Sequence, residues 1–133
     1  MSLTYKQQIQ DSVEPSAEMI AFVERQVRDA LPYVGTEKRS EHRNLMVLPV
    51  VAQALDDDFH AIDEPFPVVT RDLSPQGVGF VHTDRFDYDR LALQFTIANE
   101  KVMVVAEVEW QRDMGPFYFS GARIVAKLDT FPS

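Results

Sequence analysis

The sequence predicts a mainly β domain, an antiparallel barrel or sandwich of six short strands that follows a single N-terminal helix. Apolar residues alternate with polar ones in the second half of the chain, and short turn-forming segments separate these runs. No helical pattern interrupts the succession of strands, as is typical of antiparallel barrels and sandwiches. With 133 residues and a hydrophobic content of 45%, the chain can bury a core without covalent staples.

The helical pattern lies near the N-terminus. Between Met19 and Leu31, apolar residues recur at helical spacing on one face. Pro15 and Ser16 precede this stripe and predict the start of the helix, and Pro32 predicts its end within a residue or two. We expect the stripe to pack on the barrel of the same chain rather than on a partner.

The polar segment from Tyr33 to Asn44 has no periodicity and predicts a loop or linker. Six strands are expected after it, over residues 45–55, 66–73, 78–83, 91–97, 102–110 and 117–128. Pro49 predicts a bulge or an edge position in the first strand. Residues 99–100 predict a tight turn, and residues 112–116 predict a loop. In the fifth strand the alternation places Val102, Val104, Ala106, Val108 and Trp110 on one face, with Glu107 and Glu109 toward water.

Composition excludes several classes of protein. The absence of cysteine excludes disulfides, thiolate zinc sites and a cysteine nucleophile. A net charge of −8 argues against a protein that binds nucleic acid by general phosphate attraction. No apolar run approaches the ~20 residues of a membrane span, and the polar N-terminus lacks the apolar region of a signal peptide. We therefore expect a cytoplasmic protein without a membrane or nucleic-acid partner.

Sequence motifs for catalysis are also missing. The histidines at 42, 60 and 82 lack metal-ligand spacing and are expected in loops or on strand surfaces. Ser74 has no nucleophile context, and no glycine-rich loop precedes a helix. Residues 56–58, three consecutive aspartates, predict a solvated turn in preference to an acidic metal site. We expect no enzyme activity, no cofactor and no metal.

Two short motifs, taken together, predict a ligand. Arg39 and Arg43 stand four residues apart just before the first strand, and Asp72-Leu73-Ser74-Pro75-Gln76-Gly77 forms the turn between the second and third strands. A guanidinium matches phosphate oxygens and the O6/N7 edge of guanine. An aspartate accepts the N1–H and amine of guanine, a serine adds a hydroxyl, and a glycine lets the chain turn close to a ligand. A purine nucleotide with phosphates suits this set.

With these motifs the sequence resembles the PilZ domain, a bacterial family that binds cyclic di-GMP. That family carries Arg-x-x-x-Arg in the loop entering a six-stranded barrel, and Asp- or Asn-x-Ser-x-x-Gly in the second hairpin. Arg39 and Arg43 match the first motif, and Asp72, Ser74 and Gly77 match the second. The resemblance covers about residues 36–128. It implies a PilZ-like β-barrel domain over residues 35–133, with an N-terminal helical extension over residues 1–34.

The resemblance also implies roles for these residues. The two arginines would grip phosphates and guanine, Asp72 and Ser74 would hold a guanine edge, and Lys38 and Arg71 would add positive charge. Lys38 stands where many members have a further arginine, and Gln76 replaces a frequent second glycine. Many members end in a helix after the barrel, and here the N-terminal helix is expected to take that packing role.

The function implied is that of a non-catalytic receptor. Binding of cyclic di-GMP, as one or two molecules, would order the segment from Tyr33 to Asn44 and change the conformation that a protein partner detects. One alternative is a PilZ-like scaffold that binds no ligand and acts through protein contacts. Another is an unrelated small β-barrel enzyme or flavin-binding barrel.

Overall fold

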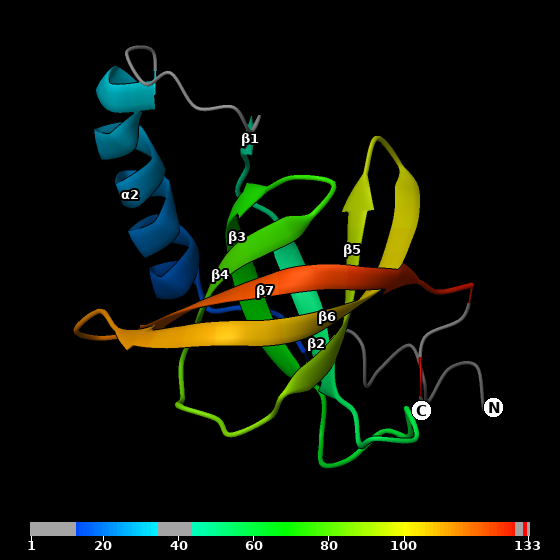
Figure 1. The fold of residues 1–133 in the computed structure, drawn as a ribbon. Helices are drawn as coiled ribbons and strands as arrows, with labels where there is room; N and C mark the ends of the chain where they lie inside the picture. Colours follow the sequence, from blue (N-terminus) through cyan, green and yellow to red (C-terminus); the bar gives the residue numbers. More distant parts are fainter. Residues whose placement is uncertain (1–12, 35–43, 130–131, 133) are drawn as a thin grey trace, which may run out of the picture.

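The computed structural model describes residues 13–34, 44–129 and 132 of the chain. One helix precedes seven strands in the described part (Figure 1). The elements are α2 (Ala17–Val34), β1 (Asn44–Leu45), β2 (Pro49–Ala54), β3 (Phe66–Leu73), β4 (Gly77–His82), β5 (Arg90–Ile97), β6 (Glu100–Asp113) and β7 (Tyr118–Lys127). Within the described residues, no helix is long and apolar enough to cross a membrane.

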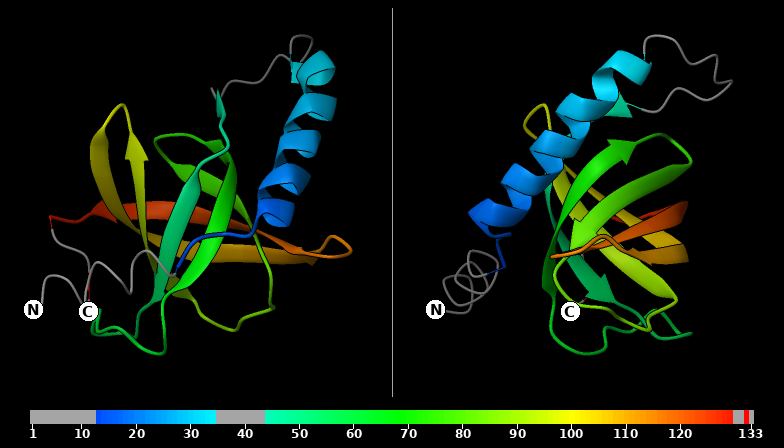
Figure 2. Two further views of the ribbon diagram at one scale, coloured as in Figure 1. Left: turned by 180° about the vertical axis from the view of Figure 1, so that it is seen from behind. Right: turned by 90° about the vertical axis from the view of Figure 1, so that its left-hand side faces the viewer.

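Six antiparallel strands close into a barrel in the order β3-β2-β5-β6-β7-β4, and the pairing of β4 with β3 completes the ring. The short strand β1 pairs with the same edge of β3 as β2 does, but nearer the end of β3. Asn44 pairs with Leu73, and Leu45 pairs with Asp72. Figure 2 shows the ring from two further sides, with the helix outside it. The predicted six-stranded antiparallel barrel with an N-terminal helix is confirmed.

Small and branched apolar side chains fill the barrel. Successive residues of a strand point to opposite faces, so every second residue contributes to this core. Each strand of the ring contributes side chains to this core. Among them are Val50, Ala52, Val68, Phe80, Leu91, Leu93, Val104, Ala106 and Ala122.

Helix α2 covers the outer face of β3 and β4. Ser16 caps its start, because the Ser16 Oγ accepts a hydrogen bond from the Met19 amide at 3.2 Å. Met19 and Val23 are fully buried in a second apolar cluster, with Val69, Val81 and Phe119 of the barrel. The prediction that the apolar stripe packs on the chain's own barrel is therefore confirmed.

Several element boundaries differ from the predictions. The helix runs to Val34 and includes Tyr33, a residue predicted in the loop. The run 45–55 is split, because Leu48 leaves the ladder: Thr70 Oγ1 donates to the Met46 carbonyl and accepts from the Leu48 amide. β2 then begins at Pro49, where the missing N–H costs least.

The β5–β6 hairpin turns one residue earlier than predicted. Ala98 and Asn99 both have positive φ, of 51° and 67°, and Ile97 pairs directly with Glu100. A two-residue turn with both φ values positive matches the twist of the flanking strands. At the other end of β6, Arg112 and Asp113 pair with β7 and are strand rather than loop.

A bulge in β3 and another in β6 change which way side chains face. In β3 the pairing with β4 passes from Thr70–Phe80 to Asp72–Gly79, so Arg71 is an extra residue. In β6 the pairing with β7 passes from Val108–Ala122 to Trp110–Gly121, so Glu109 is the extra residue. A one-residue shift moves every later side chain to the opposite face. Trp110 is thus outside the barrel with 39% of its surface exposed, and its prediction on the face of Val108 was wrong.

Candidate functional site

Asp72 lies on the outside of the barrel because of the bulge in β3. Without it, Asp72 would follow Val68 and Thr70 into the apolar interior. With it, Asp72 pairs with the outward-facing Gly79, and Leu73 takes the inward position beside Val78. The Asp72 side chain is only 6% exposed, so its carboxylate sits in a recess of the surface. The sequence-predicted acceptor for guanine is therefore held by the backbone pairing of two strands.

Two paired glycines form the bare floor beside this carboxylate. Gly79 pairs with Gly121 across β4 and β7. A Cβ on Gly79 would come 2.7 Å from Asp72 Oδ2, and one on Gly121 would overlap the indole of Trp110. Any residue other than glycine at these two positions would fill the space that the carboxylate and the indole occupy. Glycines inside strands are the sequence signal that could have identified this site.

Trp110 forms the opposite wall. Its indole lies against Gly121 and makes an edge contact with the Phe119 ring at a centroid distance of 5.0 Å. The Arg112 guanidinium lies 5.2 Å from the indole centroid. Sequence analysis missed Trp110 as a site residue, because period-two alternation across the bulge assigns it to the core.

Arg71 is positioned between these groups. Its Nε lies 3.2 Å from Asp72 Oδ2, and its guanidinium carbon stands 4.0 Å from the centroid of the Phe119 ring. Consecutive residues of a regular strand point apart, so the bulge is what allows this pair to meet. The structure thus brings Arg71 beside Asp72, and the arginine keeps 31% of its side chain exposed.

Ser74 and Gly77 shape the turn that borders the site. The Ser74 Oγ accepts hydrogen bonds from the Gly77 amide at 3.1 Å and the Gln76 amide at 3.3 Å. The Ser74 amide donates to the Gly77 carbonyl at 2.9 Å. Gly77 has an ordinary negative φ, and its need for glycine comes from the Ala122 carbonyl, 3.2 Å from where a Cβ would stand. The expected reason, a tight turn, is replaced by a close strand contact.

The remaining predicted site residues, Lys38, Arg39 and Arg43, lie outside the described part of the chain. The described site therefore contains Asp72, Ser74, Gly77 and Arg71 from the prediction. A shallow depression of about 180 Å³ adjoins it, between the Ser74 turn and Trp110. Arg123 and Glu109 line it as well, and Arg123 forms an ion pair with Glu107 at 3.1 Å.

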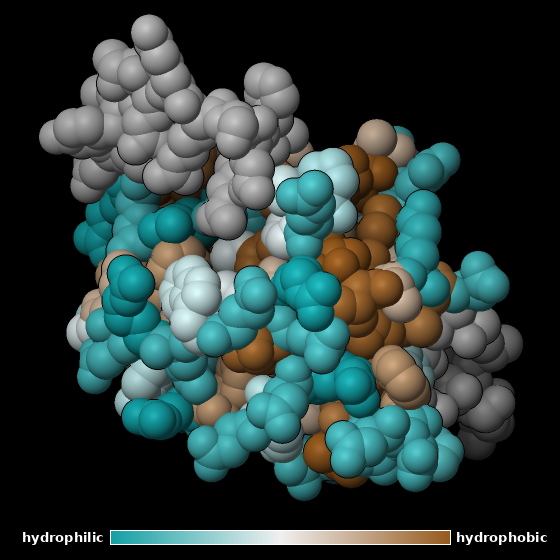
Figure 3. All heavy atoms as spheres, in the orientation of Figure 1, coloured by the Kyte–Doolittle hydropathy of each residue, from teal (hydrophilic) through white to brown (hydrophobic). Residues whose placement is uncertain are grey.

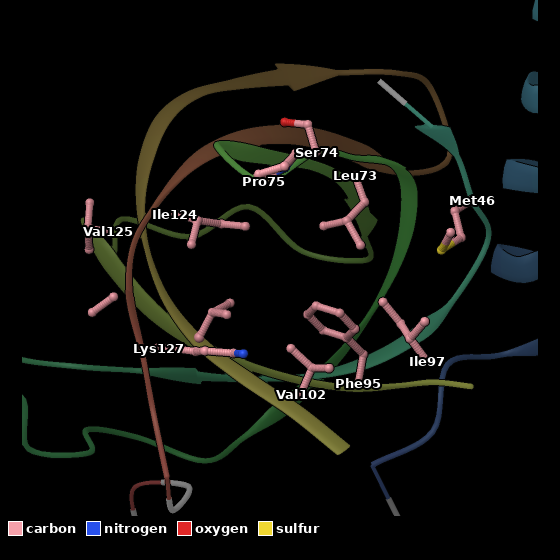
Figure 4. Close-up of a pocket in the computed structure, with 12 residues that line it drawn as sticks. Met46, Leu73, Ser74, Pro75, Phe95, Ile97, Val102, Ile124, Val125 and Lys127 are labelled. Carbon is pink, nitrogen blue, oxygen red and sulfur yellow. The ribbon is translucent and has the colours of Figure 1, made fainter. Parts of the chain in front are cut away.

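A larger cavity of about 740 Å³ opens at the end of the barrel next to the same turn. Figure 4 looks into this opening, where side chains of Leu73, Phe95 and Ile124 point inward and Ser74 and Pro75 form part of the rim. Its lining is mainly apolar. The Ser74 turn thus separates the polar recess on the outer face from the apolar mouth of the barrel.

His82 differs from its prediction as a surface or loop residue. It is 1% exposed, because it faces the interior in register with Phe80. Its Nδ1 donates to the Asp84 carbonyl at 2.7 Å, so Nε2 accepts from the Ser120 hydroxyl, also at 2.7 Å. Burial lowers the pKa of His82 below the ordinary value. Both ring nitrogens are therefore engaged in hydrogen bonds within the barrel.

The three aspartates form the predicted turn. The Asp56 Oδ1 accepts hydrogen bonds from the Asp58 and His60 amides, each at 2.9 Å, and the His60 amide is the main cause that lowers the pKa of Asp56. Ligand atoms of Asp56, Asp58 and His60 lie within 4.8 Å of one another. These hydrogen bonds fix the backbone of the loop, and this is the role that the structure shows for the cluster.

Comparison with known proteins identifies a similar fold. No protein-family model matches the sequence, and no curated protein matches it. A solved structure, that of the Bacillus subtilis inhibitor of motility MotI/DgrA, is similar with a TM-score of 0.54 and 17% sequence identity. The similarity covers 70% of this chain and 45% of that chain. At this identity it concerns the fold alone, and the chain matches less than half of that protein's length.

Proposed function

We propose that this protein is a non-catalytic receptor for cyclic di-GMP, which binds on the outer face of the barrel. The observation that carries the proposal is the position of the Asp72 carboxylate, turned outward by a bulge above the bare backbone of Gly79 and Gly121. A carboxylate held in a recess can accept the N1–H and amine of guanine. The exposed part of Trp110 offers an apolar surface to the same base.

The phosphates require positive charge next to this recess. Arg71 is one source, and Arg43 is a second candidate, because it immediately precedes Asn44, whose pairing partner Leu73 adjoins Asp72. The motif of Arg39 and Arg43 and the fold similarity to the motility inhibitor support the same proposal.

A ligand-free scaffold is the second candidate. The observation in its favour is the ion pair between Arg71 and Asp72. This pair already uses part of the hydrogen-bonding capacity of the carboxylate that guanine would need. Binding of guanine would have to share or displace this contact. The scaffold hypothesis predicts that this ion pair only stabilises the fold. Asp72→Asn would then change the stability of the protein, and no nucleotide would bind to either form.

Calorimetric titration with cyclic di-GMP separates the two candidates. We expect saturable binding of cyclic di-GMP, far weaker binding of cyclic di-AMP, and no comparable binding of GMP or cyclic AMP. Adenine presents an acceptor at N1 where guanine presents a donor, so Asp72 should discriminate between the two dinucleotides. Equal affinities for both dinucleotides would refute the role of Asp72, and no heat with either would favour the scaffold.

The arginine motif has its own test. Arg39→Ala and Arg43→Ala should each weaken binding ten- to a hundredfold, because a charge-assisted contact contributes about 1.5–3 kcal/mol. Arg43→Lys should also bind poorly, since an ammonium cannot replace the planar fork of the guanidinium. Arg28→Ala, on the exposed side of α2, is the matched control. An unchanged dissociation constant after removal of both motif arginines would contradict the proposed site.

A further inference from the structure

The end of the barrel opposite the Ser74 turn carries most of the protein's net negative charge. Two loops meet there, residues 55–65 between β2 and β3 and residues 83–89 between β4 and β5. Together they contain eight of the 21 acidic residues and one arginine, Arg85. The net charge of −8 therefore has its main source in one region of the surface. We call this region the acidic pole.

A groove with aromatic walls lies within the acidic pole. It has a volume of about 690 Å³ and is lined by Phe66, Phe86 and Tyr88. Its charged lining residues are Asp63, Glu64, Asp84 and Arg85, so carboxylates outnumber the one guanidinium. The three rings lie 5.7 to 6.3 Å apart between centroids, and each is partly exposed. The Tyr88 hydroxyl donates to Asp63 Oδ2 and ties the two loops together. The groove therefore combines ring faces with carboxylates.

Two large apolar side chains are exposed on one of the two loops that form this groove. Phe59 is 51% exposed and Ile62 is 36% exposed, and both belong to the loop 55–65. Phe59 adopts a φ of 64°, which a bulky residue rarely does, so the loop presents this ring at a cost in backbone energy. The guanidinium of Arg90, at the start of β5, lies 4.6 Å from the Phe59 centroid. The loop thus already holds one arginine against an aromatic ring.

We propose that the acidic pole is a docking surface for a partner protein segment in which arginine or lysine residues alternate with apolar ones. Aromatic faces attract cations, and carboxylates bind a guanidinium through paired hydrogen bonds, so the groove suits a basic side chain. Phe59 and Ile62 would receive the neighbouring apolar side chains. Charge complementarity identifies the occupant, because an acidic partner or a second copy of this acidic chain would be repelled at this surface.

The acidic pole lies away from the candidate nucleotide site. β3 begins at Phe66 in the groove and ends at Leu73 beside the Ser74 turn, and its eight residues span about 25 Å. Figure 1 shows the two loops at the lower end of the barrel, and hydrophilic side chains cover most of the lower part of the face in Figure 3. The two surfaces are separate enough for both to be occupied at once. The inference holds whether or not the protein binds a nucleotide.

Fluorescence anisotropy with a labelled synthetic peptide tests the proposal. The probe is a nonapeptide of alternating Arg and Leu, compared with peptides in which Glu replaces Arg or Ser replaces Leu. We expect the Arg–Leu peptide to bind in 150 mM salt and both comparison peptides to bind at least tenfold more weakly. Absence of binding of the Arg–Leu peptide at 1 mM protein would overturn the proposal.

Matched variants separate a site from general charge attraction. Asp63→Lys with Glu64→Lys should weaken peptide binding at least tenfold, whereas Glu24→Lys with Glu100→Lys, which changes net charge equally at exposed positions elsewhere, should weaken it less than twofold. Phe59→Gly removes the exposed ring and relieves the positive φ, so it should fold normally and still lose affinity. Equal losses from the two lysine pairs, or full affinity of Phe59→Gly, would refute the docking surface. Sedimentation of the unaltered protein as a dimer whose contact is broken by the Asp63 and Glu64 changes would instead assign the surface to self-association.

Discussion

Gly79→Ala changes the candidate nucleotide site without replacing any side chain that would contact the nucleotide. The new methyl carbon would stand 2.7 Å from Asp72 Oδ2, 3.0 Å from Oδ1 and 3.1 Å from Cγ. An ordinary C···O contact is about 3.4 Å, so the carboxylate must withdraw by about 0.7 Å. Asp72 is short and nearly buried, so it cannot withdraw and keep both Arg71 and a guanine at hydrogen-bond distance.

The expected loss of affinity follows from the contacts at risk. Hydrogen bonds to a charged group contribute about 1.5–3 kcal/mol, so cyclic di-GMP should bind ten- to a hundredfold more weakly to Gly79→Ala. Stability should change by less than about 1 kcal/mol. Replacing a strand glycine gains about 0.5–1 kcal/mol, and weakening the partly exposed Arg71–Asp72 pair costs a similar amount.

Calorimetric titration and urea denaturation of the same sample measure the two effects. Gly115→Ala is the control, because Gly115 has a φ of 95° in the β6–β7 hairpin and no atom lies within 4 Å of the place that its Cβ would take. That variant should lose about 1–3 kcal/mol of stability and keep its affinity. Gly79→Ala with wild-type affinity, or Gly115→Ala with reduced affinity, would refute the reasoning that links the recess to binding.

Three further predictions concern single side chains. Because burial lowers the pKa of His82, the unfolded chain binds its proton first as the pH falls, so the free energy of unfolding should decrease below about pH 6.5 and on through the lower folded pKa. The wild type should therefore lose more stability between about pH 7.5 and 5.5 than His82→Gln. Trp110→Ala should weaken cyclic di-GMP binding by about 1–3 kcal/mol and should also lower stability, because the indole packs on Phe119 and Gly121, whereas the exposed Val125→Ala should leave affinity unchanged. Ala98→Asn should stabilise the protein by about 0.5 kcal/mol, because asparagine tolerates the positive φ of the turn better than alanine, and an unchanged urea midpoint would show that the turn carries no strain.

The fold could be predicted because strand patterns are local. The alternation in β5 and the turn residues around Ser74 are visible in the sequence, and they determine strand positions to within a few residues. Ser16 likewise marks the start of the helix, and Pro32 lies within two residues of its end at Val34. These signals depend on a residue and its near neighbours along the chain.

The faces of Asp72 and Trp110 could not be predicted in the same way. Each depends on a bulge, and a bulge is a property of two paired strands rather than of one segment. Period-two alternation places Trp110 in the core because it assumes unbroken register with β7. His82 shares the parity of the inward-facing Phe80, and its expected place on the surface or in a loop was wrong because Ser120 gives the ring a buried hydrogen-bonded position. Pairing partners distant in the sequence decide these details.

The closure of the barrel has a consequence for its synthesis. β7 pairs with β6 on one side and with β4 on the other, so the ring cannot close until residues 118–127 have left the ribosome. Until then a nascent chain presents two unpaired strand edges, those of β4 and β6, at which another chain can add a strand. Pairing of β4 with β7 spans about forty residues and is intrinsically slow. Aggregation during expression is therefore expected to begin at these two edges, and a mutation that delays the docking of β7 should reduce the soluble yield even when the finished barrel is stable.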